Sequence, residues 1–143
     1  MSAKDNAAEM FRQKYNCAQA TLAALGPAEG LERDTCLKIA STFGGGIGRM
    51  GETCGAVTGS LMVLGLRCGG QTIGNPEAKA AVYERAGEFV EAFREKNGSI
   101  VCRELLGLDI STPEGMAEFK ERNLHDTFCL GLVQSACEIL EKM

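Results

Sequence analysis

The 143-residue sequence has no tryptophan, three prolines and a single histidine, and 6% of its residues are aromatic. It contains no GxSxG motif and no paired-carboxylate pattern, so with one histidine it does not indicate hydrolytic machinery. Lysine and arginine total 15 against 19 acidic residues, a net charge of −4, and no basic block occurs. This balance argues against nucleic acid and anionic membrane surfaces as partners.

Targeting and membrane-spanning signals are also lacking. Residues 1–10 contain no basic region followed by an apolar core, so no secretory signal is expected. The most apolar stretch, 57–66, is shorter than the roughly 18 residues that a membrane span needs, and Thr58 and Ser60 interrupt it. We therefore expect a cytoplasmic protein without membrane insertion, folded as one domain over residues 1–143.

Hydrophobic periodicity predicts an all-α fold, a single-domain helical bundle of about six to eight helices, several of them short. No stretch alternates with period two for long enough to indicate a strand. The expected helices cover residues 5–15, 17–25, 31–43, 54–68, 76–97 and 100–106, a short segment from 112, and a C-terminal segment from 126.

Capping residues mark several of these helix starts. Asn16 followed by Gln19 is typical of a capping box, which places a helix start at the next residue after Asn16. Thr53, Ser99 and Asp126 are expected to cap three further helices.

Residues 43–54 form a glycine-rich loop that contains a GxGxxG match at 46–51. A dinucleotide site would need a strand before this motif, whereas a helix is expected there, so we interpret it as a tightly bent loop. Gly55 and Gly59 lie four residues apart on one face of the next helix. A neighbouring helix or a cofactor packed beside Cys54 could approach the backbone at these glycines, and the glycines alone favour the helix.

Cysteine is the residue that the sequence has in excess, with seven in the chain and no signal peptide. Structural disulfides fit that context poorly, whereas metal binding or redox chemistry fits it better. Unrelated buried cysteines are the alternative, because free cysteine packs as a small hydrophobe.

Four of the seven cysteines share one feature, a place in the first turn of an expected helix: Cys17, Cys54, Cys102 and Cys129. A helix N-terminus presents unpaired N–H groups and partial positive charge, which stabilise the thiolate, the form that acts as nucleophile and metal ligand. The other three lie inside an expected helix or at its C-terminal end, where these electrostatics are missing: Cys36, Cys68 and Cys137.

The spacing of the four cysteines identifies no known site, because no CxxC occurs and the intervals are 37, 48 and 27 residues. Zinc-ribbon, ferredoxin and thioredoxin signatures are therefore absent from the sequence. A site forms only if the fold brings four helix ends together. His125 could be an alternate ligand or a base for Cys129, although a lone histidine beside a capping aspartate is more often a partly exposed surface residue.

Three motifs and a late cysteine carry a family resemblance: NCAQA at 16–20, CGAVTG at 54–59, CRELLG at 102–107 and Cys129. Together they resemble the redox-active protein family labelled C-GCAxxG-C-C over nearly the whole chain. The resemblance maps the four cysteines that the family shares onto Cys17, Cys54, Cys102 and Cys129. Related domains in split-Soret cytochromes are associated with an iron–sulfur centre, which implies a two-iron cluster here. The chain has no CxxCH motif for covalent haem.

The leading hypothesis is a redox protein whose Cys17, Cys54, Cys102 and Cys129 bind an iron–sulfur cluster, [2Fe–2S], and which passes single electrons to a partner protein. Gly55 and Gly59 are the expected cofactor contacts. The alternatives are a thiol–disulfide protein that cycles two of these cysteines without metal, a module in which zinc takes the same ligands, and a helical domain with seven buried cysteines. The sequence identifies no substrate, electron donor or oligomeric state.

Overall fold

The computed structural model describes residues 2–143, and within them the chain is all-α. Among these residues no strand is formed, and the β-type pairing is one isolated bridge between Thr53 and Val101. The predicted all-α class and helix number are confirmed by eight helices: α1 (Ala3–Arg12), α2 (Cys17–Leu25), α3 (Arg33–Ala40), α4 (Gly55–Cys68), α5 (Lys79–Asn97), α6 (Cys102–Leu106), α7 (Pro113–Glu121) and α8 (Leu130–Glu141).

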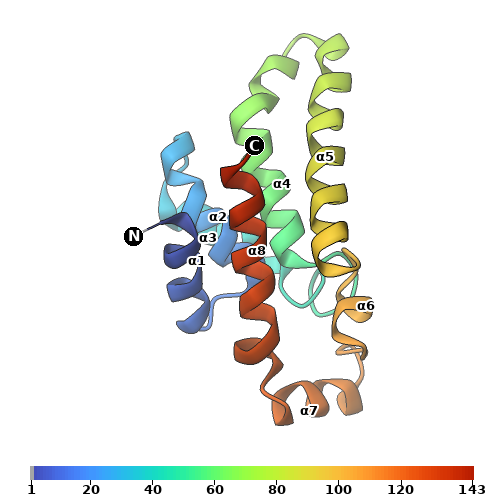
Figure 1. Cartoon of the computed structure of the whole chain (residues 1–143). Coiled ribbons are helices and arrows are strands. Elements are labelled where there is room, and N and C mark those ends of the chain that lie inside the picture. Colours follow the sequence, from blue (N-terminus) through green and yellow to red (C-terminus); the bar gives the residue numbers. More distant parts are fainter. Residues whose placement is uncertain (1) are drawn as a thin grey trace.

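Helix α4 lies at the centre of the bundle and packs against α2, α5 and α8 (Figure 1). Helix α1 packs on α2 and α8, and α3 packs on α2. The short helices α6 and α7 lie at the lower end of the bundle in Figure 1, between the end of α5 and the start of α8. Between residues 2 and 143, no helix combines the length and the apolar character that crossing a membrane requires.

Local capping explains why α2 begins and ends where the sequence predicts. The backbone N–H of Gln19 donates to Asn16 Oδ1 at 2.8 Å, and Gln19 Oε1 accepts from the backbone N–H of Asn16 at 3.0 Å. This reciprocal pair satisfies two N–H groups that the first turn leaves unpaired. The helix ends at Leu25, the last residue of the expected range 17–25.

The predicted cap at Thr53 is wrong, because Cys54 is the residue before α4 and the helix begins at Gly55. Thr53 is held in extended conformation by its bridge to Val101, and the N–H of Cys54 donates to the Ile100 carbonyl at 2.8 Å. Pairing with a segment almost fifty residues away therefore decides where this helix starts.

The predicted caps at Asp126 and Ser99 are also wrong. The chain is already helical at Leu124 and forms a π turn over His125–Cys129 that continues into α8. The Asp126 carboxylate instead contacts His125 Nδ1 at 3.0 Å, so it is not available to cap. Ser99 Oγ accepts from the Val101 N–H at 3.0 Å, and α6 begins at Cys102, two residues later than expected.

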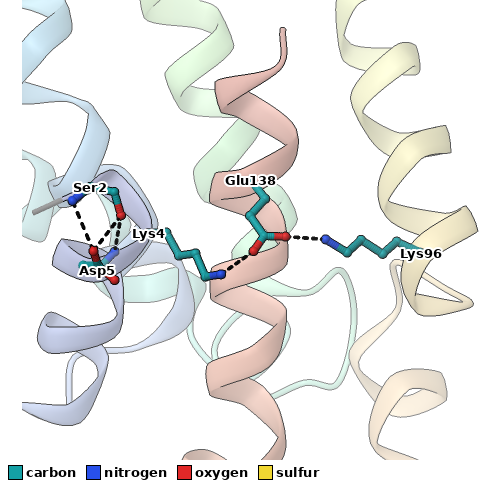
Figure 2. Close-up of polar contacts among 5 residues, drawn as sticks. All are labelled: Ser2, Lys4, Asp5, Lys96 and Glu138. Carbon is teal, nitrogen blue, oxygen red and sulfur yellow. Dashed lines mark hydrogen bonds and ion pairs between the residues drawn. The ribbon is translucent and has the colours of Figure 1, made fainter.

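One carboxylate joins three helices on the side of the bundle that Figure 2 shows. Glu138 of α8 pairs with Lys4 of α1 and accepts a hydrogen bond from Lys96 Nζ of α5 at 2.6 Å. The hydrogen bond from Lys4, followed by that from Lys96, lowers the pKa of Glu138 to about 2. Helices α1, α5 and α8 are thus linked through one ionised carboxylate.

Alanine substitutions at two glycines of α4, one that faces α2 and one that faces open space, measure how closely α2 packs on α4. A Cβ on Gly59 would lie 2.9 Å from the Ala18 carbonyl oxygen and 3.1 Å from Thr21 Cβ, whereas a Cβ on Gly65 would meet nothing within 4 Å. We expect Gly59→Ala to lower the free energy of unfolding by about 1–3 kcal/mol, because the helices must separate. We expect Gly65→Ala to raise it by about 0.5–1 kcal/mol, since alanine favours an exposed helix interior. Urea unfolding measures both, and changes of the same sign would contradict this packing.

Candidate cysteine site

The four cysteines that the sequence singles out line the same cavity, which has a volume of about 70 Å³. Each comes from a different part of the chain: Cys17 begins α2, Cys54 precedes α4, Cys102 begins α6 and Cys129 ends the π turn before α8. A water molecule needs roughly 10–15 Å³ in this measure, so the cavity has room for several atoms. The fold therefore brings together thiols that are far apart in the sequence.

Backbone pairing holds Cys54 and Cys102 on the same wall of this cavity. The Cys102 N–H donates to the Glu52 carbonyl at 2.6 Å, and the Cys54 N–H donates to the Ile100 carbonyl at 2.8 Å. Arg103 Nη1 adds hydrogen bonds to the Met50 carbonyl at 3.1 Å and to the Glu52 side chain at 3.2 Å. The CRELLG motif is thus fastened to the loop that precedes Cys54.

The loop that contains the GxGxxG match bends tightly, as predicted, and follows a 3₁₀ turn at Ser41–Phe43. Five successive residues, 45–49, have positive φ, a conformation that glycine adopts most readily. At Gly46 a Cβ would lie 2.6 Å from both Cys102 Cβ and the Glu52 backbone nitrogen. The absence of a side chain there lets the loop lie directly against one of the cavity thiols.

Cys129 reaches the cavity by a route that the sequence does not indicate. It ends the π turn rather than opening a helix, and the Leu130 N–H donates to the His125 carbonyl, five residues back. Its neighbouring N–H groups are therefore not the unpaired donors of a helix start, so that part of the prediction is wrong. Single π turns within helices are common at functional sites.

The thiols affect one another's ionisation because they are in contact. Hydrogen-bond contact with Cys129, then with Cys54, raises the pKa of Cys17 well above its ordinary value. The same contact with Cys17 lowers the pKa of Cys54, assisted by the Ala56 and Val57 N–H groups at the start of α4 and opposed by burial. Neither N–H group makes a complete capping hydrogen bond to the Cys54 sulfur atom.

Burial is the main influence on Cys102 and raises its pKa to about 12. The prediction that a helix start lowers the pKa of each of these thiols therefore fails at Cys17 and at Cys102. Desolvation and contact between thiols outweigh the helix electrostatics at both positions. Cys54 is the cavity thiol with a lowered pKa.

The other three cysteines lie away from the cavity, as their expected positions indicate. Cys36 Sγ donates to the Leu31 carbonyl at 3.4 Å, and Cys68 Sγ donates to the Leu64 carbonyl at 3.0 Å. Burial raises the pKa of Cys137 to about 12. All seven cysteines are free thiols.

His125 lies in the cavity wall rather than on the open surface, with 25% of its side chain exposed. Its ring stacks on Phe11 with a centroid distance of 3.8 Å and an interplanar angle of 9°. The contact from Nδ1 to Asp126 at 3.0 Å fixes one edge of the ring. A partly exposed histidine is what the sequence favours, and 25% exposure agrees with that, but no sequence signal indicates that the ring stacks on Phe11 of α1.

The rest of the cysteine cavity's wall is mostly apolar, and its residues were not predicted as part of the site from the sequence. Its main side chains are Phe11, Leu105, Leu106, Ile110, Phe119 and Leu132. Apolar periodicity could place these residues in a core but could not show which of them surround the thiols. Within residues 2–143, no three His, Cys, Asp or Glu side chains stand in position to hold a metal ion.

The two glycines expected to contact a cofactor differ in position. Gly55 lines the cavity, and a Cβ there would lie 2.8 Å from the Ala18 nitrogen and 3.0 Å from Cys17 Cβ. Gly59 lies one turn further along α4 against Ala18 and Thr21 of α2. Close helix packing thus accounts for Gly59, and a cofactor contact at either glycine stays a prediction.

Comparison with known proteins agrees with the resemblance noted in the motifs. Residues 15–143 match the model of the family described as "Putative redox-active protein (C_GCAxxG_C_C)". An uncharacterised protein of Archaeoglobus fulgidus is 30% identical over 145 aligned positions, which cover 96% of this chain and 89% of that protein. No solved structure matches significantly. The chain belongs to the C_GCAxxG_C_C family of redox-active proteins.

Proposed function

We propose that Cys17, Cys54, Cys102 and Cys129 bind an iron–sulfur cluster with two irons, and that the protein exchanges single electrons with a partner protein. The observation that carries the proposal is that four thiols from four separate elements line one small cavity. Cysteine thiolates are the usual ligands of such clusters, and four of them complete a two-iron site.

The side chains of residues 2–143 do not themselves stand in a metal-binding arrangement, but the surroundings of the four thiols suit this group. No carboxylate is among the residues that line the cavity, so the soft sulfur ligands have no hard oxygen competitor in the described structure. Of the four cavity cysteines, Cys54, Cys102 and Cys129 are at most 9% exposed. This burial keeps bulk water from their sulfur atoms. The cluster would supply reversible one-electron transfer when bound.

The chain's own residues have defined tasks in this proposal. The pairing of segments 51–54 and 100–103 holds Cys54 and Cys102 at a fixed separation, and Gly46 and Gly55 admit close approach of the backbone. Buried backbone and apolar groups around thiolates tune a reduction potential through hydrogen bonding and exclusion of water. The seven free cysteines favour a reducing compartment such as the cytoplasm.

A second candidate, a thiol–disulfide protein, is favoured by one observation. The neighbouring thiols of Cys129 and Cys54 raise the pKa of Cys17, and the Cys17 thiol lowers that of Cys54, so these sulfur groups interact in the cavity. A pair of adjacent thiols with unequal pKa values is the arrangement from which a disulfide forms and exchanges. Mass analysis after alkylation of oxidised and reduced protein would then show a change confined to one of these pairs.

Elemental analysis and an absorption spectrum of anaerobically purified protein separate the candidates. The cluster proposal predicts about two irons and two acid-labile sulfides per chain, with a visible absorption that bleaches on reduction. Colourless protein with about one zinc per chain would indicate a zinc site. Protein with neither metal, in which two cavity thiols oxidise reversibly, would support the disulfide candidate and end the cluster proposal.

A further inference from the structure

A second hollow of about 510 Å³ adjoins the cysteine cavity and carries positive charge, although the chain as a whole has a net charge of −4. Its cationic lining residues are Lys14, Arg49 and Lys120, and we call this hollow the basic groove. No aspartate or glutamate is among its described lining residues. A concave surface of one charge focuses the electric field and attracts ions of the opposite charge.

Two of the three cations are available to a ligand. Lys14 Nζ contacts the Asp126 carboxylate at 3.4 Å, and Asp126 also contacts His125. Within residues 2–143, Arg49 and Lys120 form no ion pair. A guanidinium and an ammonium group facing one hollow are suited to bind a carboxylate or a phosphate.

The backbone beneath the groove is held in an unfavourable conformation. Lys14, Arg49 and Asn123 have φ values of 77°, 63° and 51°, and they are three of the four non-glycine residues with positive φ in the described chain. All three line a smaller hollow of about 350 Å³ beside the groove. Arg49 stands in a loop that is otherwise rich in glycine, so it occupies a position where glycine would cost less. Such residues tend to gather at ligand sites.

The basic groove and the cysteine cavity share part of their walls, since Asn16, Gly45, Ile110, Phe119 and His125 line both. The shared wall therefore allows a molecule that is bound in the groove by one end to extend its other end to the cysteine cavity. The groove volume lies within the roughly 300–1,000 Å³ typical of small-molecule sites, and its concave form suits a small ligand better than a protein surface.

We propose that the basic groove binds a small molecule through a carboxylate or phosphate group and presents the rest of that molecule to the cysteine cavity. Arg49 and Lys120 hold the anionic group, and the shared wall at Phe119 and His125 contacts the remainder. Any electron transfer between the cysteine site and this molecule rests on the function proposed above. Binding of the anion does not depend on what the cysteines hold.

Titration calorimetry and NMR at low ionic strength test the groove with pyrophosphate, for the phosphate class, and citrate, for the carboxylate class. Sodium chloride at matched ionic strength is the reference. We expect one of the two probes to bind and to shift the ring resonances of His125, because that ring lies in the shared wall. We expect the double variant Arg49→Gly, Lys120→Gln to weaken that binding at least tenfold. The probe that binds more tightly identifies whether the ligand belongs to the phosphate or the carboxylate class.

Two controls keep the result specific. Lys79→Gln removes an exposed cation that forms no ion pair with any residue of the described chain and lies outside the three hollows, so it should change the affinity less than twofold. Arg49→Gly places glycine at a position with positive φ, so the melting temperature of this variant should not fall below that of the wild-type protein. An unchanged or higher melting temperature excludes unfolding as the cause of lost binding.

The proposal is overturned if neither probe binds more tightly than chloride, if Lys79→Gln causes the same loss, or if an acidic polypeptide such as polyglutamate binds while both small anions fail. Iron and sulfide are measured on the same samples. Anion binding without a cluster would refute the proposed function alone, and a cluster without anion binding would refute the groove alone.

Discussion

Replacement of Cys54 by serine is expected to reduce bound iron and sulfide to background after anaerobic purification. Serine keeps nearly the same size, but its hydroxyl is a poor ligand for iron in place of a thiolate. Cys54 is the cavity thiol with a lowered pKa, which favours the ionised form that binds metal. The measurement is iron and sulfide per chain together with the visible absorption of the variant.

Cys68→Ser is the matched control for this experiment. Cys68 is partly exposed at the end of α4 and lies outside the cavity, so its replacement should leave metal content and spectrum unchanged. Cys36 and Cys137 are poorer controls, because both are fully buried and serine there would disturb the core. Wild-type iron and sulfide in Cys54→Ser, or equal loss in Cys68→Ser, would refute the ligand assignment.

A methyl group at Gly46, in the glycine-rich loop, is expected to cause a large loss of stability. Its Cβ would lie 2.6 Å from both Cys102 Cβ and the Glu52 nitrogen, and the backbone there has a φ of 68°. We expect Gly46→Ala to lower the free energy of unfolding by about 2–5 kcal/mol, combining overpacking with the left-handed conformation. Denaturant titration measures this change.

Gly48→Ala separates the two causes, because Gly48 has a φ of 54° but its Cβ would meet no atom closer than 3.6 Å. Only the conformational cost of about 1–2 kcal/mol applies there. The difference between the variants therefore measures how tightly the loop packs on Cys102. If both lose the same stability, the close approach at Gly46 is not present in solution.

Local sequence signals predicted the parts of the fold that depend on neighbouring residues. The capping box of Asn16 and Gln19 fixed the start of α2, and Gly98 ends α5 in the left-handed conformation that a helix stop of this kind requires. The start of α4 was misplaced by one residue, since Thr53 pairs with Val101 across the loop. Sequence patterns do not show such long-range pairing.

The cysteine site shows the same division between local and long-range information. Sorting by expected helix starts selected the four thiols that line the cavity, although Cys129 lies in a π turn and not at a helix start. The pKa values could not be foreseen, because contact with Cys129 and Cys54 dominates at Cys17 and burial dominates at Cys102. The basic groove was missed because Lys14, Arg49 and Lys120 come from three distant segments.

The wide separation of the cavity thiols along the chain also has a consequence for biosynthesis. Cys129 follows Cys17 by 112 residues, so translation at about 5–20 residues per second leaves roughly 6–22 s between them. Throughout that interval the earlier thiols emerge without their last neighbour and face the redox conditions around the ribosome. The cavity wall that shelters these sulfur atoms is therefore complete only after the C-terminal residues have been synthesised.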